Sequence, residues 1–134
     1  MTTPRAAWTL DAIPWGETAP DGTRYALLEG RRDSEGKLFT YAFFIPAGFW
    51  DAAHWHTQDA RVVVLSGALY LGYGDLLEVS KAEPFEAGSV LVVPAGDRHF
   101  DGSLEDTVII GVARGVWATH YVDANVMPSA GTVS

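Results

Sequence analysis

Cysteine is absent from the 134-residue sequence, which excludes disulfide bonds, thiolate metal sites and cysteine nucleophiles. Basic residues are scarce: 9 lysines and arginines stand against 17 acidic residues, for a formal net charge of -8. Because a negative field repels phosphate backbones, we expect no nucleic-acid partner. No apolar run approaches the roughly 20 residues that span a bilayer, and the first residues lack a secretory signal pattern. We therefore expect no membrane partner and a cytoplasmic location.

Hydrophobic residues make up 48% of the chain and charged residues 19%. This composition can bury a core, and the length fits one domain rather than two. We predict an N-terminal arm over residues 1–20, a compact domain over residues 21–127 and a flexible tail over residues 128–134. Trp8 and Trp15 in the arm are suited to lie across the domain or against a partner subunit.

Short apolar runs alternate with turns that contain glycine and proline. The runs are rich in β-branched and aromatic residues, which pack well on a half-buried pleated surface. No segment keeps a helical period, and helix candidates are confined to the arm and residues 75–81. Evenly spaced short strands predict an all-β protein, an antiparallel sandwich or barrel. The predicted strands are Tyr25–Glu29, Leu38–Ile45, Arg61–Leu65, Ala68–Tyr73, Val90–Val93, Thr107–Val112 and Trp117–Val122.

Two of the four histidines, His54 and His56, stand two residues apart. In a strand, such residues point to the same face, with Cα atoms roughly 6.7 Å apart. Two imidazoles so placed can bind one metal ion through Nε2, although two exposed histidines on an edge strand would give the same pattern. The turns at residues 46–48 and 94–96 both read Pro-Ala-Gly, and each shortly precedes a histidine.

The segments around these histidines resemble the two signature motifs of the cupin superfamily. Residues 48–67 read Gly-X5-His-X-His and close on a glycine, and residues 88–99 read Gly-X5-Pro-X-Gly-X2-His. Their order and separation match the cupin motifs, and the surrounding strand pattern extends the resemblance over most of the chain. The resemblance implies a small antiparallel jelly-roll β-barrel that binds a metal near its mouth through His54, His56 and His99.

Two positions depart from the cupin pattern. The glutamate expected seven residues before the closing glycine is replaced by Ala60, and the final asparagine of the second motif by Ser103. Strand alternation places Gln58 on the face of His54 and His56, so we predict Gln58 as a fourth, weaker oxygen ligand. The alternative is a polar loop residue. Loss of the glutamate also leaves open a site that has decayed or binds metal adventitiously.

Three neutral imidazoles leave a divalent ion its charge and open coordination positions, which favours a chelating anion such as an enolate or diketonate. This ligand set resembles the three-histidine iron sites of cysteine dioxygenase and of a β-diketone-cleaving dioxygenase. The resemblance implies a dioxygenase, an oxidoreductase that uses Fe(II) on a small chelating substrate such as a β-diketone or an enolisable carbonyl compound. Nitrogen ligands alone do not select the metal, so zinc, nickel and manganese stay open. The alternatives are a non-redox isomerase, dehydratase, cyclase or lyase, and a non-enzymatic ligand-binding cupin.

Tyr41 shares one face of a predicted strand with Phe39 and Phe43, and that face should line the barrel. We predict that Tyr41 orients a substrate oxygen; the alternative is a buried aromatic residue whose hydroxyl finds a local partner. Asp101 is interpreted as part of a solvated turn, and His120, which belongs to neither motif, as structural. Cupins commonly pair through sheet edges or exchanged arms, so the resemblance also implies a homodimer.

Overall fold

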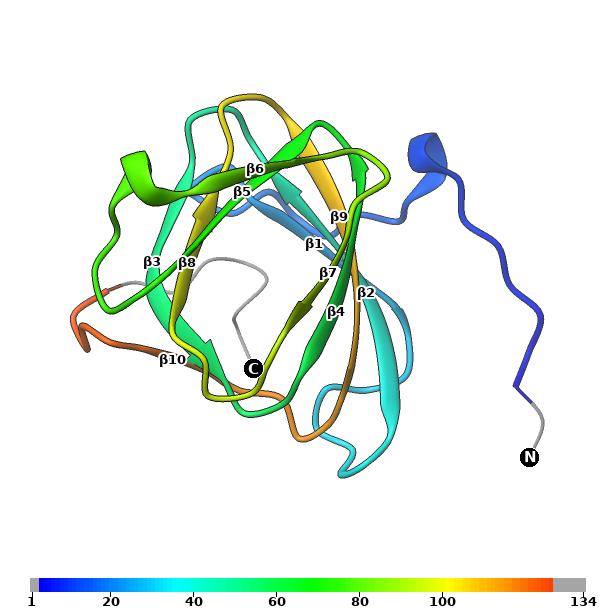
Figure 1. Ribbon diagram of the computed structural model, residues 1–134. Helices are drawn as coiled ribbons and strands as arrows, with labels where there is room; N and C mark the ends of the chain where they lie inside the picture. Colours follow the sequence, from blue (N-terminus) through cyan, green and yellow to red (C-terminus); the bar gives the residue numbers. More distant parts are fainter. Residues whose placement is uncertain (1–2, 127–134) are drawn as a thin grey trace.

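The computed structural model describes residues 3–126, which form two five-stranded antiparallel sheets that close into a barrel (Figure 1). One sheet has the strand order β1-β2-β9-β4-β7 and the other the order β10-β3-β8-β5-β6. The strands are β1 (Arg24–Glu29), β2 (Leu38–Ile45), β3 (Trp50–His56), β4 (Ala60–Ser66), β5 (Ala68–Tyr73), β6 (Glu83–Glu86), β7 (Val90–Val93), β8 (His99–Gly102), β9 (Thr107–Arg114) and β10 (Thr119–Tyr121).

This architecture confirms the predicted all-β jelly-roll barrel. The helix candidates are single 3-10 turns, η1 (Leu10–Ala12) and η2 (Val79–Lys81). Strand β10 is shorter than predicted because Trp117 precedes it in an irregular segment. The tail predicted over residues 128–134 lies outside the described residues. Within residues 3–126, no helix has the length and apolarity needed to cross a bilayer.

Strand β4 shows how the sequence selects the interior of the barrel. Ala60, Val62 and Val64 are buried, whereas Arg61 and Val63 between them are exposed. This alternation follows from the pleat, because successive side chains of a strand point to opposite faces. The buried members join one core cluster with Trp117 and with side chains from both sheets, namely Phe39, Phe43, Ile45, Leu69, Leu71, Val93, Ile109 and Ala113.

The N-terminal segment packs on the outer face of the first sheet. Ile13 is buried there against Ala26 and Val108, and Trp15 meets Phe44 edge to face with ring centroids 6.2 Å apart. Beyond η1 the segment leaves the barrel, and Trp8 is 39% exposed (Figure 1). Ile13 and Trp15 thus lie against the first sheet, whereas the division into arm and domain and the homodimer stay predictions.

Candidate metal centre

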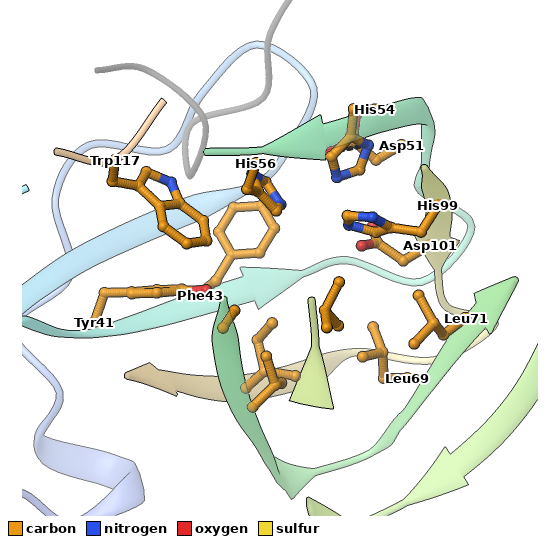
Figure 2. A pocket seen from close by; sticks show the side chains of 14 residues that line it. Tyr41, Phe43, Asp51, His54, His56, Leu69, Leu71, His99, Asp101 and Trp117 are labelled. Atoms are coloured by element: carbon orange, nitrogen blue, oxygen red, sulfur yellow. Dashed lines mark ion pairs between the residues drawn. The ribbon is translucent and has the colours of Figure 1, made fainter. Parts of the chain in front are cut away.

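Three histidines from two neighbouring strands face one cavity inside the barrel (Figure 2). His54 and His56 lie on β3, and His99 opens β8, where it pairs with His54. The ring centroids are 4.3 Å apart for His54 and His99, 5.0 Å for His54 and His56, and 5.1 Å for His56 and His99. One nitrogen of each ring lies within 4.8 Å of the others, so the cluster could hold a divalent metal ion.

Hydrogen bonds fix which nitrogen each ring presents to the cavity. The Nδ1–H of His54 donates to the Ala52 carbonyl at 2.6 Å, and that of His99 donates to the Asp97 carbonyl at 2.8 Å. The Nδ1 of His56 contacts the Thr119 hydroxyl at 2.9 Å. Because Nδ1 of each ring is engaged in a hydrogen bond, Nε2 is left as the nitrogen that can bind a metal ion. Metal-binding histidines commonly show this arrangement.

Burial favours the neutral form of two of these imidazoles, those of His56 and His99. Burial, together with the neighbouring His54 and His99, lowers the pKa of His56 to about 2. The pKa of His99 is also lowered, chiefly by burial and then by His54. A neutral imidazole offers a lone pair to a metal, whereas an imidazolium does not. The donor set therefore fits a divalent ion at neutral pH without first losing protons from His56 or His99.

Two carboxylates that the sequence analysis did not place in the site lie beside the histidines. Asp51 on β3 pairs with Asp101 on β8, and both line the cavity. Asp101 shares a face with His99 because the two residues are two positions apart. Asp51 and His54 are three positions apart, and an irregular register between them turns both to the interior. The interpretation of Asp101 as part of a solvated turn was therefore wrong.

The two carboxyl groups hold their protons more tightly than exposed ones do. Burial and the nearby Asp51 raise the pKa of Asp101 to about 7. Burial also raises the pKa of Asp51, whose carboxylate accepts a hydrogen bond from the Tyr121 hydroxyl at 2.6 Å. A divalent cation bound nearby would favour the ionised carboxylates. Together with His54, the pair forms a second group of ligand atoms within 4.8 Å of one another.

Tyr41 lies in the wall of the same cavity. Its ring stacks between aromatic neighbours, with centroids 5.7 Å from Tyr25 and 5.9 Å from Phe39, and fills the space above Gly111. Burial raises the pKa of Tyr41, so its hydroxyl stays protonated at neutral pH and can donate a hydrogen bond. The predicted orienting role is compatible with this place and stays a prediction.

Gln58 is not brought to the histidines. Strand β3 ends at His56, and the chain bends at residues 57 and 58, so the alternation that would have turned Gln58 inward stops before it. Gln58 instead lines a separate surface pocket with Asp59 and Arg61. Nothing among the described residues supports Gln58 as a fourth metal ligand.

The segment around β10 holds His56 in place. Strand β10 pairs with β3 so that Thr119 lies opposite His56. The Trp117 ring stacks on the His56 imidazole, with centroids 4.3 Å apart and planes inclined by 24°. Trp117 is itself fixed by its backbone N–H, which donates to the Arg32 carbonyl at 2.8 Å. His54 and His99 are oriented by backbone carbonyls two residues away in the sequence. His56 is instead oriented by the Thr119 hydroxyl and the Trp117 ring, which come from a segment far along the chain.

The Thr119→Val substitution tests this dependence. Valine keeps the shape of threonine and the pairing of β10 but removes the hydroxyl that contacts His56 Nδ1. We expect metal affinity to fall at least about tenfold, as is usual when a hydrogen bond behind a metal ligand is lost. Competition with a chelating dye measures it, and Thr119→Ser, which keeps the hydroxyl, should retain most of the affinity. Equal affinity in the valine variant would contradict the role of Thr119.

The sequence matches no protein-family profile and none of the curated proteins. Solved structures do resemble the fold. KdgF from a Halomonas species superposes with a TM-score of 0.62 at 19% identity, covering 81% of this chain and 94% of its own. A Klebsiella pneumoniae protein with a double-stranded β-helix domain gives 0.66 at 14% identity, covering 87% and 96%. A cupin superfamily protein from Desulfitobacterium hafniense gives 0.58 at 14% identity, covering 73% and 82%.

The chain has the cupin fold. Its two cupin-like motifs accordingly meet where the sequence analysis expected, with His54 and His56 on β3 against His99 on β8. At the position of the usual cupin glutamate, Ala60 lines the cavity and contributes no ligand. Asp101, two residues past the motif histidine, supplies a carboxylate from the opposite sheet instead.

Proposed function

We propose that this cupin is a metal-dependent enzyme, a dioxygenase that uses Fe(II) on a small chelating substrate such as a β-diketone or an enolisable carbonyl compound. One observation carries the proposal: three imidazoles, each with Nδ1 engaged in a hydrogen bond, direct Nε2 into a cavity that also opens to solvent. His54, His56 and His99 would hold the ion, and the bound ion would supply Lewis acidity and redox chemistry.

The residues around the ion would bind and orient the substrate. The Tyr41 hydroxyl can donate a hydrogen bond to a substrate oxygen, and the buried apolar side chains of the cavity exclude water from the carbonyl groups. Cleavage of a β-diketone by O₂ balances without an external reductant. Both oxygen atoms enter the products, a carboxylic acid and a 2-oxoaldehyde, and one carbon–carbon bond is broken.

A specific observation also favours a second candidate, a non-redox isomerase or lyase that stabilises an enolate. Such an enzyme needs a protein group within reach of the substrate to move a proton. Asp101 faces the cavity beside the histidines and has the chemistry for that task. The position of Asp101 therefore supports the non-redox candidate as the alternative to the dioxygenase.

Metal content and oxygen consumption separate the candidates. The protein should be purified without a histidine tag or chelator, and its metal measured by inductively coupled plasma mass spectrometry. We expect near-stoichiometric iron, and O₂ uptake when acetylacetone is added to the Fe(II)-loaded protein. Zinc, nickel or manganese with no O₂ uptake under Fe(II) loading would overturn the dioxygenase in favour of the non-redox enzyme. No metal, even after reconstitution, would overturn both.

A further inference from the structure

The floor of the cavity, on the side away from the histidines, is lined by apolar side chains. These side chains come from both sheets, with Leu69 and Leu71 on β5, Val62 on β4, Val93 on β7 and Ile109 on β9. Figure 2 shows Leu69 and Leu71 on the side opposite His54 and His56. Each of the five floor residues is less than a tenth exposed, so a ligand that reaches the floor leaves water behind.

The polar groups of the cavity are few and gathered at one end. Among residues 3–126, the lining contains the three histidines, Asp51 and Asp101, but no lysine, arginine, serine, threonine, asparagine or glutamine. Hydroxyl donors and indole N–H groups are limited to Tyr41 and Trp117. A sugar-like ligand would therefore leave most of its hydroxyl groups without partners, and each buried polar group without a partner is costly.

No arginine or lysine is among the described residues that line the cavity, although the charge of the nearby Arg32 acts on Tyr41 and His56 in that lining. Arg32 lies over the Tyr25 ring, with Cζ 5.1 Å from the centroid, and Tyr25 is itself outside the lining. Arg98, next to a metal-site histidine in sequence, pairs at the surface with Asp75 at 3.1 Å. Among the described residues of the lining, Asp51 and Asp101 are the acidic side chains and none is a lysine or arginine. A second anionic group that reaches the floor would therefore meet apolar side chains.

We infer that the natural ligand is an apolar chelator, a molecule with one bidentate oxygen group at the metal end and a small hydrocarbon body on the floor of Leu69, Leu71 and Ile109. This inference rests on the proposed metal site and adds the class of substrate. It excludes sugar acids, dicarboxylates and phosphorylated compounds as ligands of this cavity.

A matched series of β-diketones tests the inference. Acetylacetone, dipropionylmethane and acetylpyruvate share one chelating group, and differ by two added methylenes or by a methyl replaced with a carboxylate. The protein loaded with Co²⁺ reports binding through its visible spectrum, and each affinity is referred to that of the same diketone for free Co²⁺. We expect dipropionylmethane to bind roughly tenfold more tightly than acetylacetone, since each buried methylene is worth about fourfold. We expect acetylpyruvate to bind at least about tenfold more weakly.

Two variants of strand β4 test whether the tighter binding of dipropionylmethane depends on the floor of the cavity. Val62→Thr puts a hydroxyl on the floor at nearly constant volume and should reduce the advantage of dipropionylmethane severalfold. Val63→Thr makes the same change on the outer face of β4, where Val63 is 37% exposed, and should leave the advantage unchanged.

The outcomes distinguish this inference from the function on which it rests. If the protein fails to bind Co²⁺, or no diketone perturbs its spectrum, the proposed function falls and the inference falls with it. If Co²⁺ and diketones bind but acetylpyruvate binds as tightly as acetylacetone, only the apolar substrate class is overturned. An equal response of the Val62 and Val63 variants would overturn the assignment to the floor.

Discussion

Replacing His99 by alanine should abolish metal binding and any activity that depends on it. His99 is 2% exposed, and it is the one histidine of the cluster that β8 contributes, beside the two of β3. Each ligand of a protein zinc site accounts for a few kcal/mol of binding free energy, so loss of one of three should weaken binding at least about a hundredfold. Metal content after purification, and affinity by chelator competition, give the result.

His120→Ala provides the matched control, because His120 is the remaining histidine and lies outside the cluster. Its ring stacks on Trp55 instead, with centroids 4.4 Å apart. This variant should keep its metal and its activity. Circular dichroism on both variants shows whether the barrel is intact. Stoichiometric metal in a folded His99→Ala variant would show that the ion, where bound, is held elsewhere.

The Asp101→Asn substitution should stabilise the metal-free protein above about pH 4 and should reduce the stabilisation gained on metal loading. Burial and Asp51 raise the pKa of Asp101 to about 7 in the folded protein. The folded protein therefore keeps a proton on Asp101 that the unfolded chain releases near pH 4. Stability of the metal-free protein contributed by this group therefore falls as the pH rises from about 4 to 7. Asparagine has the same shape and does not ionise, so the variant escapes this loss.

Melting temperatures of the chelator-treated proteins measure the effect. We expect no difference at pH 4, and a variant more stable by roughly 5 °C or more at pH 8, since each pKa unit corresponds to about 1.4 kcal/mol. The rise in melting temperature on metal loading should be smaller in the variant, because a bound cation favours the ionised carboxylate that asparagine lacks. The exposed Glu83, changed to glutamine, controls for the loss of one negative charge. A metal-free variant less stable than the parent at pH 8 would refute the argument.

Strand alternation accounts for most of what the sequence predicted correctly. The Ala60–Ser66 strand buries every second side chain, and the same rule puts His54 and His56 on one face. It also applied to Asp101, which follows His99 by two residues. The acidic surroundings and the neighbouring glycine at residue 102 concealed that signal, because they are typical of a solvated turn.

The remaining features depend on where alternation breaks. Asp51 turns inward only because the β3–β8 pairing changes register between it and His54, and a sequence pattern of period two cannot show such a shift. Gln58 was misplaced for the opposite reason, since alternation was carried past the end of β3. Trp117 stacks on His56 from an irregular segment, although the two residues are far apart in the sequence. The local sequence does not predict the register shift beside Asp51, the end of β3 before Gln58 or the stacking of Trp117 on His56.

The reliance of His56 on Trp117 and Thr119 has a consequence for biosynthesis. Ribosomes make the chain from the N-terminus, so His54, His56 and His99 all emerge before the residues that orient His56. A nascent barrel that ends short of β10 can present two oriented imidazoles but lacks the contacts that hold the third. If the cluster binds a metal ion, its full affinity would therefore arise only late in synthesis, once β10 and the segment before it have been made.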